Sequence, residues 1–278
     1  MVMSMVSNIK VYVPFNLIIF MSISIMYWNV QGAASSKFRC SFKTIVKNYN
    51  SSLVVLMEPR VSGIKAYEFI KKSDFDNSHR VEVVGFSGGN WLLWRSFIEV
   101  DVLFNHRQII HFRICMNNAF VSWATYVYAS PNPMLWRQLW NHMDCLARSI
   151  QGPWLIGGDF NSILYASEKH GGIARHHGVC GLFRQWFNGH QIFYLKFKGQ
   201  RFTWPRETLL KRLDSALCNN DWLLKFADNY VLHLPKVASD HRPVLVQFKG
   251  ADSRKQINRP FQFLASWLTH EHFNTFVK

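Results

Sequence analysis

Cysteine pairs are missing from this sequence. Its five cysteines stand at positions 40, 115, 145, 180 and 218, and no two of them are separated by only two residues. This spacing excludes the Cys-x-x-Cys ligand pairs of a zinc ribbon, and the odd number argues against a small disulfide framework. A reducing compartment is the simpler interpretation, so we expect a nuclear or cytoplasmic protein.

Acidic residues are also scarce. The chain of 278 residues has 17 of them against 32 lysines and arginines, which gives a net charge of +15 at pH 7. Charged residues make up only 18%, too few for a coiled coil, and hydrophobic residues make up 49%, too many for a disordered chain. The positive excess suits a polyanionic partner, either nucleic acid or an acidic membrane surface.

The most apolar stretch, residues 11–28, allows three interpretations. It could be the core of a signal peptide or a short membrane anchor, although Pro14 and Asn16 interrupt it. In the third interpretation, residues 21–27 form a buried strand and residues 1–20 are an extension outside the domain. We favour the third, because cleavage would remove Trp28 and Asn29, which belong to a motif described below. It predicts no stable association with a membrane.

Short apolar runs, punctuated by glycine, proline, asparagine and aspartate, predict a strand-rich chain with a few helices. The candidate strands are Ser22–Trp28, Leu53–Met57, Val81–Phe86, Asn90–Trp94, Ile98–Phe104, Ile109–Cys115, Val121–Tyr128, Trp154–Ile156, Arg201–Trp204 and Val244–Phe248. The candidate helices are Lys37–Asn48, Pro133–Ile150, Gly181–Gly189 and Asp221–Ala227. This mixture predicts a layered α/β or α+β domain over residues 21–248.

The composition changes after Phe248. Residues 249–259 are polar and basic, which is typical of a linker, and residues 260–278 begin a new amphipathic pattern. We therefore expect a linker and the start of another region at 249–278.

Several apolar runs end in a polar residue. Asn29, Glu58, Tyr128 and Asp159 each follow such a run, and Asn161 stands two residues after Asp159. Each alone has an ordinary explanation as a turn residue, a solvated strand end or a helix cap. Together they are more informative, because a carboxylate at the end of a buried strand is costly unless it is paired or bound to a metal.

Two further segments add charge near apolar runs. Asp240 and His241 precede the run that starts at Val244, and Asp214 stands between basic residues and another run. Hard oxygen ligands can hold a divalent metal, an Asp/Asn pair can orient and deprotonate water, and a histidine held by a carboxylate can stabilise developing negative charge. These residue types are sufficient for hydrolysis of a phosphodiester.

The ordered set of motifs resembles the endonuclease/exonuclease/phosphatase superfamily, and within it the AP-endonuclease-like endonuclease domain of plant non-LTR (LINE-type) retrotransposons. The motifs are YWNVQG (27–32), LMEPR (56–60), GGNWLLW (88–94), YASPN (128–132), GGDFN (157–161), RFTWP (201–205), KRLD (211–214) and SDHRP (239–243). The resemblance implies a DNase I-like four-layer α/β sandwich, in which two packed β-sheets are flanked by helices. It also implies that residues 260–278 are similar to the segment that joins such a domain to a reverse transcriptase.

The resemblance further implies roles for individual residues. Glu58 would be the principal Mg²⁺ ligand, with Asn29 and Asp240 beside it, and Mn²⁺ could substitute. The implied catalytic residues are Asp159 and Asn161 for the water, Tyr128 for the phosphate, and His241 with its partner Asp214 for the phosphoryl oxygen. The implied DNA-binding residues are Thr203, Trp204, Arg201 and Arg242.

Two positions depart from the family pattern. Gln31 stands where AP endonucleases have an acid, and Ser215 stands where an arginine is common. The resemblance gives the first departure little weight, because plant retrotransposon members often lack that acid too, and the second predicts a weaker backbone contact.

Three functions remain open from the sequence. The first is a Mg²⁺-dependent endonuclease that nicks one DNA strand and leaves a 3′-hydroxyl, acting as a monomer and derived from a retrotransposon without its reverse transcriptase. The second is an inactive, DNA-binding relic of such an element. The third, which only the charge and the apolar N-terminus support, is a hydrolase of lipid or inositol phosphates.

Overall fold

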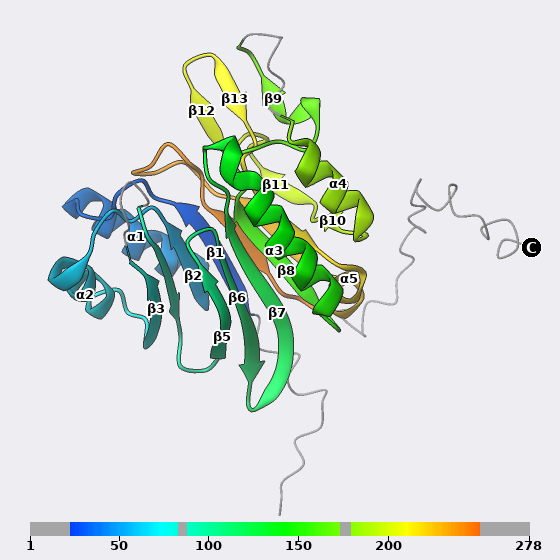
Figure 1. Ribbon diagram of the computed structural model, residues 1–278. Coiled ribbons are helices and arrows are strands. Elements are labelled where there is room, and N and C mark those ends of the chain that lie inside the picture. The colour runs from blue at the N-terminus through cyan, green and yellow to red at the C-terminus, as the bar shows by residue number, and fades with distance from the viewer. Residues whose placement is uncertain (1–22, 83–87, 173–178, 251–278) are drawn as a thin grey trace, which may run out of the picture.

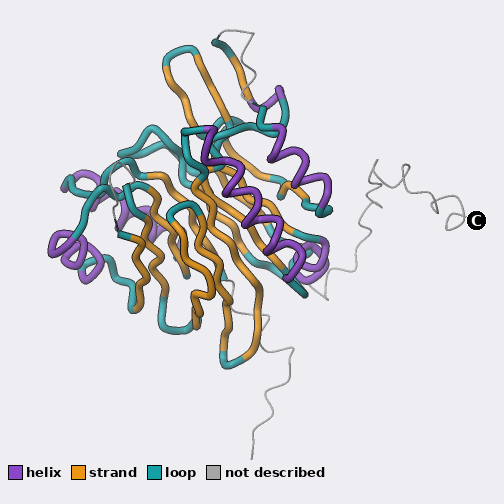
Figure 2. The backbone as a smooth tube through the Cα atoms, viewed as in Figure 1, coloured by secondary structure: helices purple, strands orange, loops and turns teal. Residues whose placement is uncertain are grey.

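The computed structural model describes residues 23–82, 88–172 and 179–250. Two mixed β-sheets dominate this part of the chain (Figure 2). The first sheet has the order β11-β15-β16-β1-β2-β4-β3. Its strands are β1 (Ser24–Asn29), β2 (Leu53–Met57), β3 (Asn77–Val81), β4 (Asn90–Trp94), β11 (Phe197–Gly199), β15 (Tyr230–His233) and β16 (Val244–Gln247).

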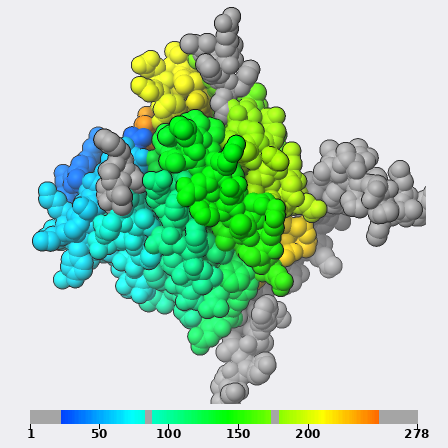
Figure 3. Space-filling model, viewed as in Figure 1, coloured from blue at the N-terminus to red at the C-terminus, as the bar shows by residue number. Residues whose placement is uncertain are grey.

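The second sheet has the order β10-β14-β8-β7-β6-β5. Its strands are β5 (Glu99–His106), β6 (Ile109–Met116), β7 (Ala119–Tyr128), β8 (Trp154–Asp159), β10 (Phe193–Tyr194) and β14 (Asp214–Cys218). A small third sheet, formed by β9 (Lys169–His170), β12 (Trp204–Arg206) and β13 (Leu209–Lys211), projects at one end of the molecule (Figure 3).

Helices cover the outer faces of both sheets (Figure 1). Helices α1 (Ser36–Tyr49) and α2 (Gly63–Lys71) pack on the first sheet through the aromatic contacts of Phe38 with Trp28 and of Phe69 with Trp91. Helices α3 (Trp136–Ser149) and α4 (Gly181–Gly189) pack on the second, and a short 3₁₀ turn, η2 (Pro133–Leu135), precedes α3. Three apolar clusters separate the four layers, so the predicted α/β sandwich is confirmed.

Local chemistry explains where the best-predicted helix begins and ends. Ser35 caps α1, since its hydroxyl accepts the N–H of Phe38, and Asn50 ends the helix in the left-handed conformation that asparagine tolerates. Phe38, Phe42, Ile45 and Val46 supply the buried stripe. The sequence pattern predicted this helix as Lys37–Asn48, within one residue at each end.

Other predictions shift or were wrong. The predicted strand Val81–Phe86 is β3 at Asn77–Val81 instead, and residues 83–87 lie outside the described part. The predicted strand Arg201–Trp204 begins only at Trp204, since Thr203 is held by side-chain hydrogen bonds in front of it. Helix α5 (Asn220–Lys225) is shorter than Asp221–Ala227 at its end, and α2, β14 and β15 were not predicted.

The terminal predictions fall mostly on residues that are not described. These are the extension 1–20 and the restart at 260–278, so the domain boundaries at 21 and 248 stay predictions. None of the helices within residues 23–82, 88–172 and 179–250 combines the length and the apolar character that crossing a membrane requires.

Candidate active site

Strand pairing brings the polar strand ends to one edge of the sandwich. β1 and β2 are parallel, with Asn29 opposite Met57, so Asn29 lies beside the strand end that leads into Glu58. β7 and β8 are also parallel, with Tyr128 opposite Asp159, and the antiparallel β14 places Asp214 opposite Asp159. Five separate segments of the sequence thereby converge, and the hydrogen bonds from Asn29 to Asp159 and from Tyr128 to Glu58 join the two sheets.

Asp159 is the centre of this group. Its carboxylate accepts the Asn29 Nδ2–H at 2.9 Å and the backbone N–H of Asn161 at 2.9 Å, and it is completely buried. Burial is the main cause that raises the pKa of Asp159, and the Asp214 charge raises it further. His241 and the two hydrogen bonds lower it, and the net pKa is about 6. A carboxyl group poised there can accept a proton near neutral pH.

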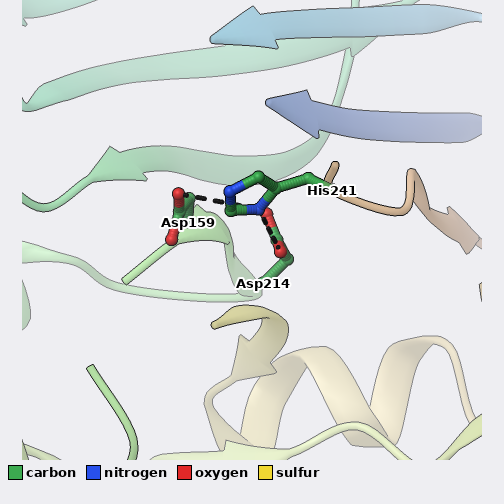
Figure 4. Close-up of side chains that lie close together, drawn as sticks. All are labelled: Asp159, Asp214 and His241. Carbon is green, nitrogen blue, oxygen red and sulfur yellow. Dashed lines mark hydrogen bonds and ion pairs between the residues drawn. The ribbon is translucent and has the colours of Figure 1, made fainter. Parts of the chain in front are cut away.

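His241 forms a buried pair with Asp214. Its Nδ1 lies 2.8 Å from Asp214 Oδ2 and 3.9 Å from Asp159 Oδ2 (Figure 4). Burial alone lowers the pKa of His241, but the charges of Asp214 and Asp159 outweigh it and raise the pKa to about 10. Nδ1 therefore carries a proton and donates it to Asp214, which fixes the ring and leaves Nε2 for another partner.

Glu58 adopts a left-handed backbone conformation with φ at 50°. Its carboxylate contacts the Tyr128 hydroxyl with one oxygen and the Arg60 guanidinium with the other. Gly88 permits this arrangement, because a Cβ there would lie 2.8 Å from Glu58 Cα and 3.1 Å from Arg60 Cγ. Burial and the hydrogen bond to Glu58 raise the pKa of Tyr128, so its hydroxyl stays a donor.

Asn161 and Ser239 tie the remaining loops to the site. The Asn161 Nδ2–H donates to Ala129 O at 2.7 Å, which joins the loop after β8 to the end of β7. Ser239 Oγ donates to Asn29 O at 2.7 Å and accepts the His241 N–H at 3.1 Å. Ser239 belongs to the motif SDHRP but was not predicted as a site residue; its position two residues before His241 was the available indication.

The predicted DNA-binding residues divide into two groups. Thr203 is completely buried, and its Oγ1 accepts the N–H groups of Leu213 and Asp214 at 3.1 and 3.0 Å. This placement does not fit a contact with DNA; Thr203 instead holds the start of β14. Arg201 is exposed, Trp204 and Arg242 are partly exposed, and Trp204 Nε1 donates to Asp240 Oδ2 at 2.9 Å.

Two further residues were not singled out from the sequence. Arg60 contacts Glu58, as described above, and Asn90 accepts the Tyr126 hydroxyl at 2.6 Å. Asn90 Nδ2 also donates to Arg107 O at 3.0 Å. Arg60 lies in the motif LMEPR and Asn90 in GGNWLLW, and their polar character within these motifs was the available indication of a role at the site.

The oxygen atoms of the site fit a hard divalent cation. Asn29 Oδ1 and Asp240 Oδ1 are buried and have no hydrogen-bond partner, which is costly without a ligand. Asn29, Asp240 and Glu58 would offer only oxygen ligands, which Mg²⁺ and Mn²⁺ prefer. Asp159, Asp214 and His241 also lie within 4.8 Å of one another; Asn29 engages one oxygen of Asp159 and His241 one oxygen of Asp214, while Asp214 Oδ1 is buried and has no hydrogen-bond partner.

Solved structures with the same fold include three nucleases. The endonuclease domain of TRAS1, a telomere-specific non-LTR retrotransposon, is 13% identical with a TM-score of 0.61 and covers 82% of this chain and 99% of that chain. An AP endonuclease from Archaeoglobus fulgidus is 13% identical with a TM-score of 0.63, covering 81% and 99%. The 3′-5′ exonuclease NExo from Neisseria meningitidis is 17% identical with a TM-score of 0.62, covering 82% and 100%.

At these identities the likeness establishes the fold. No curated protein matches the sequence significantly. The family model described as Endonuclease/Exonuclease/phosphatase family matches residues 26–241, from β1 to the histidine of the buried pair, which is more than half of the chain. The chain therefore belongs to the Endonuclease/Exonuclease/phosphatase family.

Proposed function

We propose that this protein is a divalent-metal-dependent phosphodiester hydrolase that nicks one strand of DNA and leaves a 3′-hydroxyl. The observation that carries the proposal is the buried Asp159–Asp214–His241 group, together with the buried, unpartnered oxygens of Asn29 and Asp240. A charge cluster of this kind costs folding free energy, and a structural role alone does not need it.

The substrate class follows from charge and from the fold. A net charge of +15 favours a polyanion, and TRAS1 is described as a retrotransposon endonuclease, while a Neisseria NExo variant was solved bound to a product DNA hairpin. We extend DNA as the substrate to this chain, and with it an origin in a retrotransposon. Lys and Arg side chains, among them Arg201 and Arg242, would contact phosphates, and the partly exposed Trp204, whose ring centroid lies 6.4 Å from that of His241, would contact the DNA beside them.

Each residue then has a defined task. Glu58, Asn29 and Asp240 would hold Mg²⁺, which supplies Lewis-acid polarisation of a phosphate oxygen. Asp159 accepts a proton from the attacking water, and Asn161 aligns that water. The water oxygen bonds to phosphorus, the bond from phosphorus to the 3′-oxygen breaks, and the 3′-oxygen takes a proton from solvent as Asp159 releases its own.

The other residues act on the phosphate. His241, held by Asp214, donates a hydrogen bond from Nε2 to a phosphoryl oxygen that gains charge in the transition state. Tyr128 donates its hydroxyl proton in a hydrogen bond to the same group. His241 is held in position by Asp214 before the substrate binds, which is what makes such stabilisation effective, whereas Tyr128 must first release its hydrogen bond to Glu58.

A plasmid-nicking assay tests the proposal. We expect conversion of supercoiled to nicked plasmid that depends on Mg²⁺ or Mn²⁺. Analysis of the DNA ends should identify a 3′-hydroxyl at each nick, and DNA ligase should reseal the nicks. Glu58→Ala and His241→Ala should abolish this activity. Equal inactivity of wild type and variants, with salt-sensitive DNA binding, would instead identify an inactive relic; release of phosphate from inositol lipids would identify a lipid phosphatase.

A further inference from the structure

Helix α1 carries an unusual concentration of positive charge. Its 14 residues include Lys37, Arg39, Lys43 and Lys47, and none is acidic. All four side chains are exposed. Arg39, Lys43 and Lys47 are spaced four residues apart, so they form one stripe along the outer face of the helix. We call these three residues the α1 stripe.

Most of the charge on α1 does not serve the stability of the helix, although Lys47 in the last turn is favourable toward the helix dipole. Like charges four residues apart repel each other, and Lys37 and Arg39 lie near the N-terminal end, where the helix dipole disfavours cations. None of the ion pairs found within the described residues involves the stripe. On α3, by contrast, Arg148 pairs with Asp144 four residues before it.

The neighbouring helix continues this charge. Helix α2 and its C-terminal cap add Lys65, Lys71 and Lys72 against the single acid Glu68. α1 and α2 lie together on the outer side of the first sheet (Figure 1) and contact each other through Phe38 and Phe42 with Phe69. The outer face of this layer is therefore strongly basic.

The stripe starts close to the candidate active site. Gly32 N–H donates to Glu58 O at 2.8 Å and Ala33 N–H to Pro59 O at 2.7 Å, so the loop that leads into α1 is bonded to the segment of Glu58. From Arg39 to Lys47 the helix rises about 12 Å. A nucleic-acid strand, with one phosphate per roughly 3.4 Å, presents several phosphates over that length.

We propose that the α1 stripe binds the phosphodiester backbone of the nucleic acid that extends past the cleavage site. This inference rests on the proposed function, and the partner is identified by charge complementarity. The stripe adds affinity for long substrates, while a short duplex that fills only the catalytic edge does not reach it.

The test compares the wild-type chain with the triple variant Arg39→Gln/Lys43→Gln/Lys47→Gln. Binding is measured as a function of salt for a duplex of about four helical turns and for one of about a single turn. For the long duplex, we expect the slope of log Kd against log salt to fall by about 2.7, which corresponds to roughly a hundredfold weaker binding at 0.15 M salt. Binding and nicking of the short duplex should not change.

A control and single variants keep the test decisive. Arg113→Gln/Arg148→Gln removes exposed charge from the second sheet and α3, and should leave the slope unchanged. Each single substitution in the stripe should lower the slope by about 0.9. The proposal is overturned if the triple variant changes the salt slope no more than the control variant does. It is also overturned if the triple variant weakens binding of the long and the short duplex equally.

Two further outcomes have separate meanings. Loss of binding to phosphatidylserine vesicles with DNA binding intact would show that the stripe faces a membrane, and would also overturn the proposal. Nicking tests the proposed function separately: if that function is wrong, wild type nicks neither duplex. The salt dependence of Kd still tests whether the α1 stripe binds the long duplex.

Discussion

Thr203 offers the sharpest test of how the site is built. Its hydroxyl oxygen accepts two buried backbone N–H groups, those of Leu213 and Asp214, and Asp214 in turn holds His241. Thr203→Val keeps the shape of the side chain but removes this acceptor. Leaving two buried donors unsatisfied should lower the free energy of unfolding by about 2–4 kcal/mol.

The same substitution should also affect catalysis. We expect the start of β14 to shift, and a misplacement of catalytic groups by about 1 Å can cost on the order of a hundredfold in rate. Because Thr203 is completely buried, the Kd for DNA should stay the same. Urea unfolding, kcat for nicking, and DNA binding under non-cleaving conditions measure the three effects.

Thr203→Ser is the matched control. It keeps the hydroxyl and loses one methyl group, so it should cost only about 1 kcal/mol and retain most of kcat. If Thr203→Val and Thr203→Ser have equal stability and equal kcat, the positioning role is wrong. If Thr203→Val weakens DNA binding without changing kcat, Thr203 contacts DNA after all.

Three further predictions concern charge, pH and packing. Arg60→Gln removes the guanidinium from Glu58, so the half-saturating Mg²⁺ concentration for nicking should fall by up to about fivefold, and a rise would show that Arg60 supports the metal site. Burial lowers the pKa of His111 and of His233 to about 4, so each histidine binds more protons in the unfolded state than in the folded state below pH 6.5. Between pH 6.5 and pH 5 each should contribute a fall of about 1.6 kcal/mol to the free energy of unfolding, which Asp159, with its pKa raised to about 6, partly offsets. His111→Gln should remove the share of His111, and an unchanged pH dependence in urea titrations would contradict its burial as a neutral ring. Gly157→Ala places a Cβ 2.4 Å from the Tyr27 ring and should destabilise the fold by about 1–3 kcal/mol; an unchanged thermal midpoint would contradict the packing of β1 against β8.

Strong apolar runs made part of the fold predictable from the sequence. Leu53–Met57 and Asn90–Trp94 were predicted with the correct bounds, because each run is buried along most of its length. Helix α2 was missed because its apolar residues do not follow one buried face: Ile64 is 78% and Tyr67 60% exposed. β15 is only four residues long, which is too short for a clear pattern.

The site was predictable in its residue types and less so in its contacts. Polar residues at the ends of apolar runs identified Asn29, Glu58 and Asp159, but the hydrogen bond between Asn29 and Asp159 joins residues 130 positions apart. The burial of Thr203 depends on the packing of β12 and β14, which no local pattern reveals. The contact of Arg60 with Glu58 depends on Gly88, a residue on another segment.

Metal-dependent nicking by a purified chain with a single altered carboxylate tests whether this site hydrolyses phosphodiesters. Wild type should nick supercoiled plasmid with Mg²⁺ and stop when EDTA is added. Glu58→Gln, which keeps the size of the side chain, should lose the activity, and the matched control Glu99→Gln on exposed β5 should retain it. Nicking that survives in Glu58→Gln, or that continues in EDTA, would contradict a metal-dependent hydrolase built on this site.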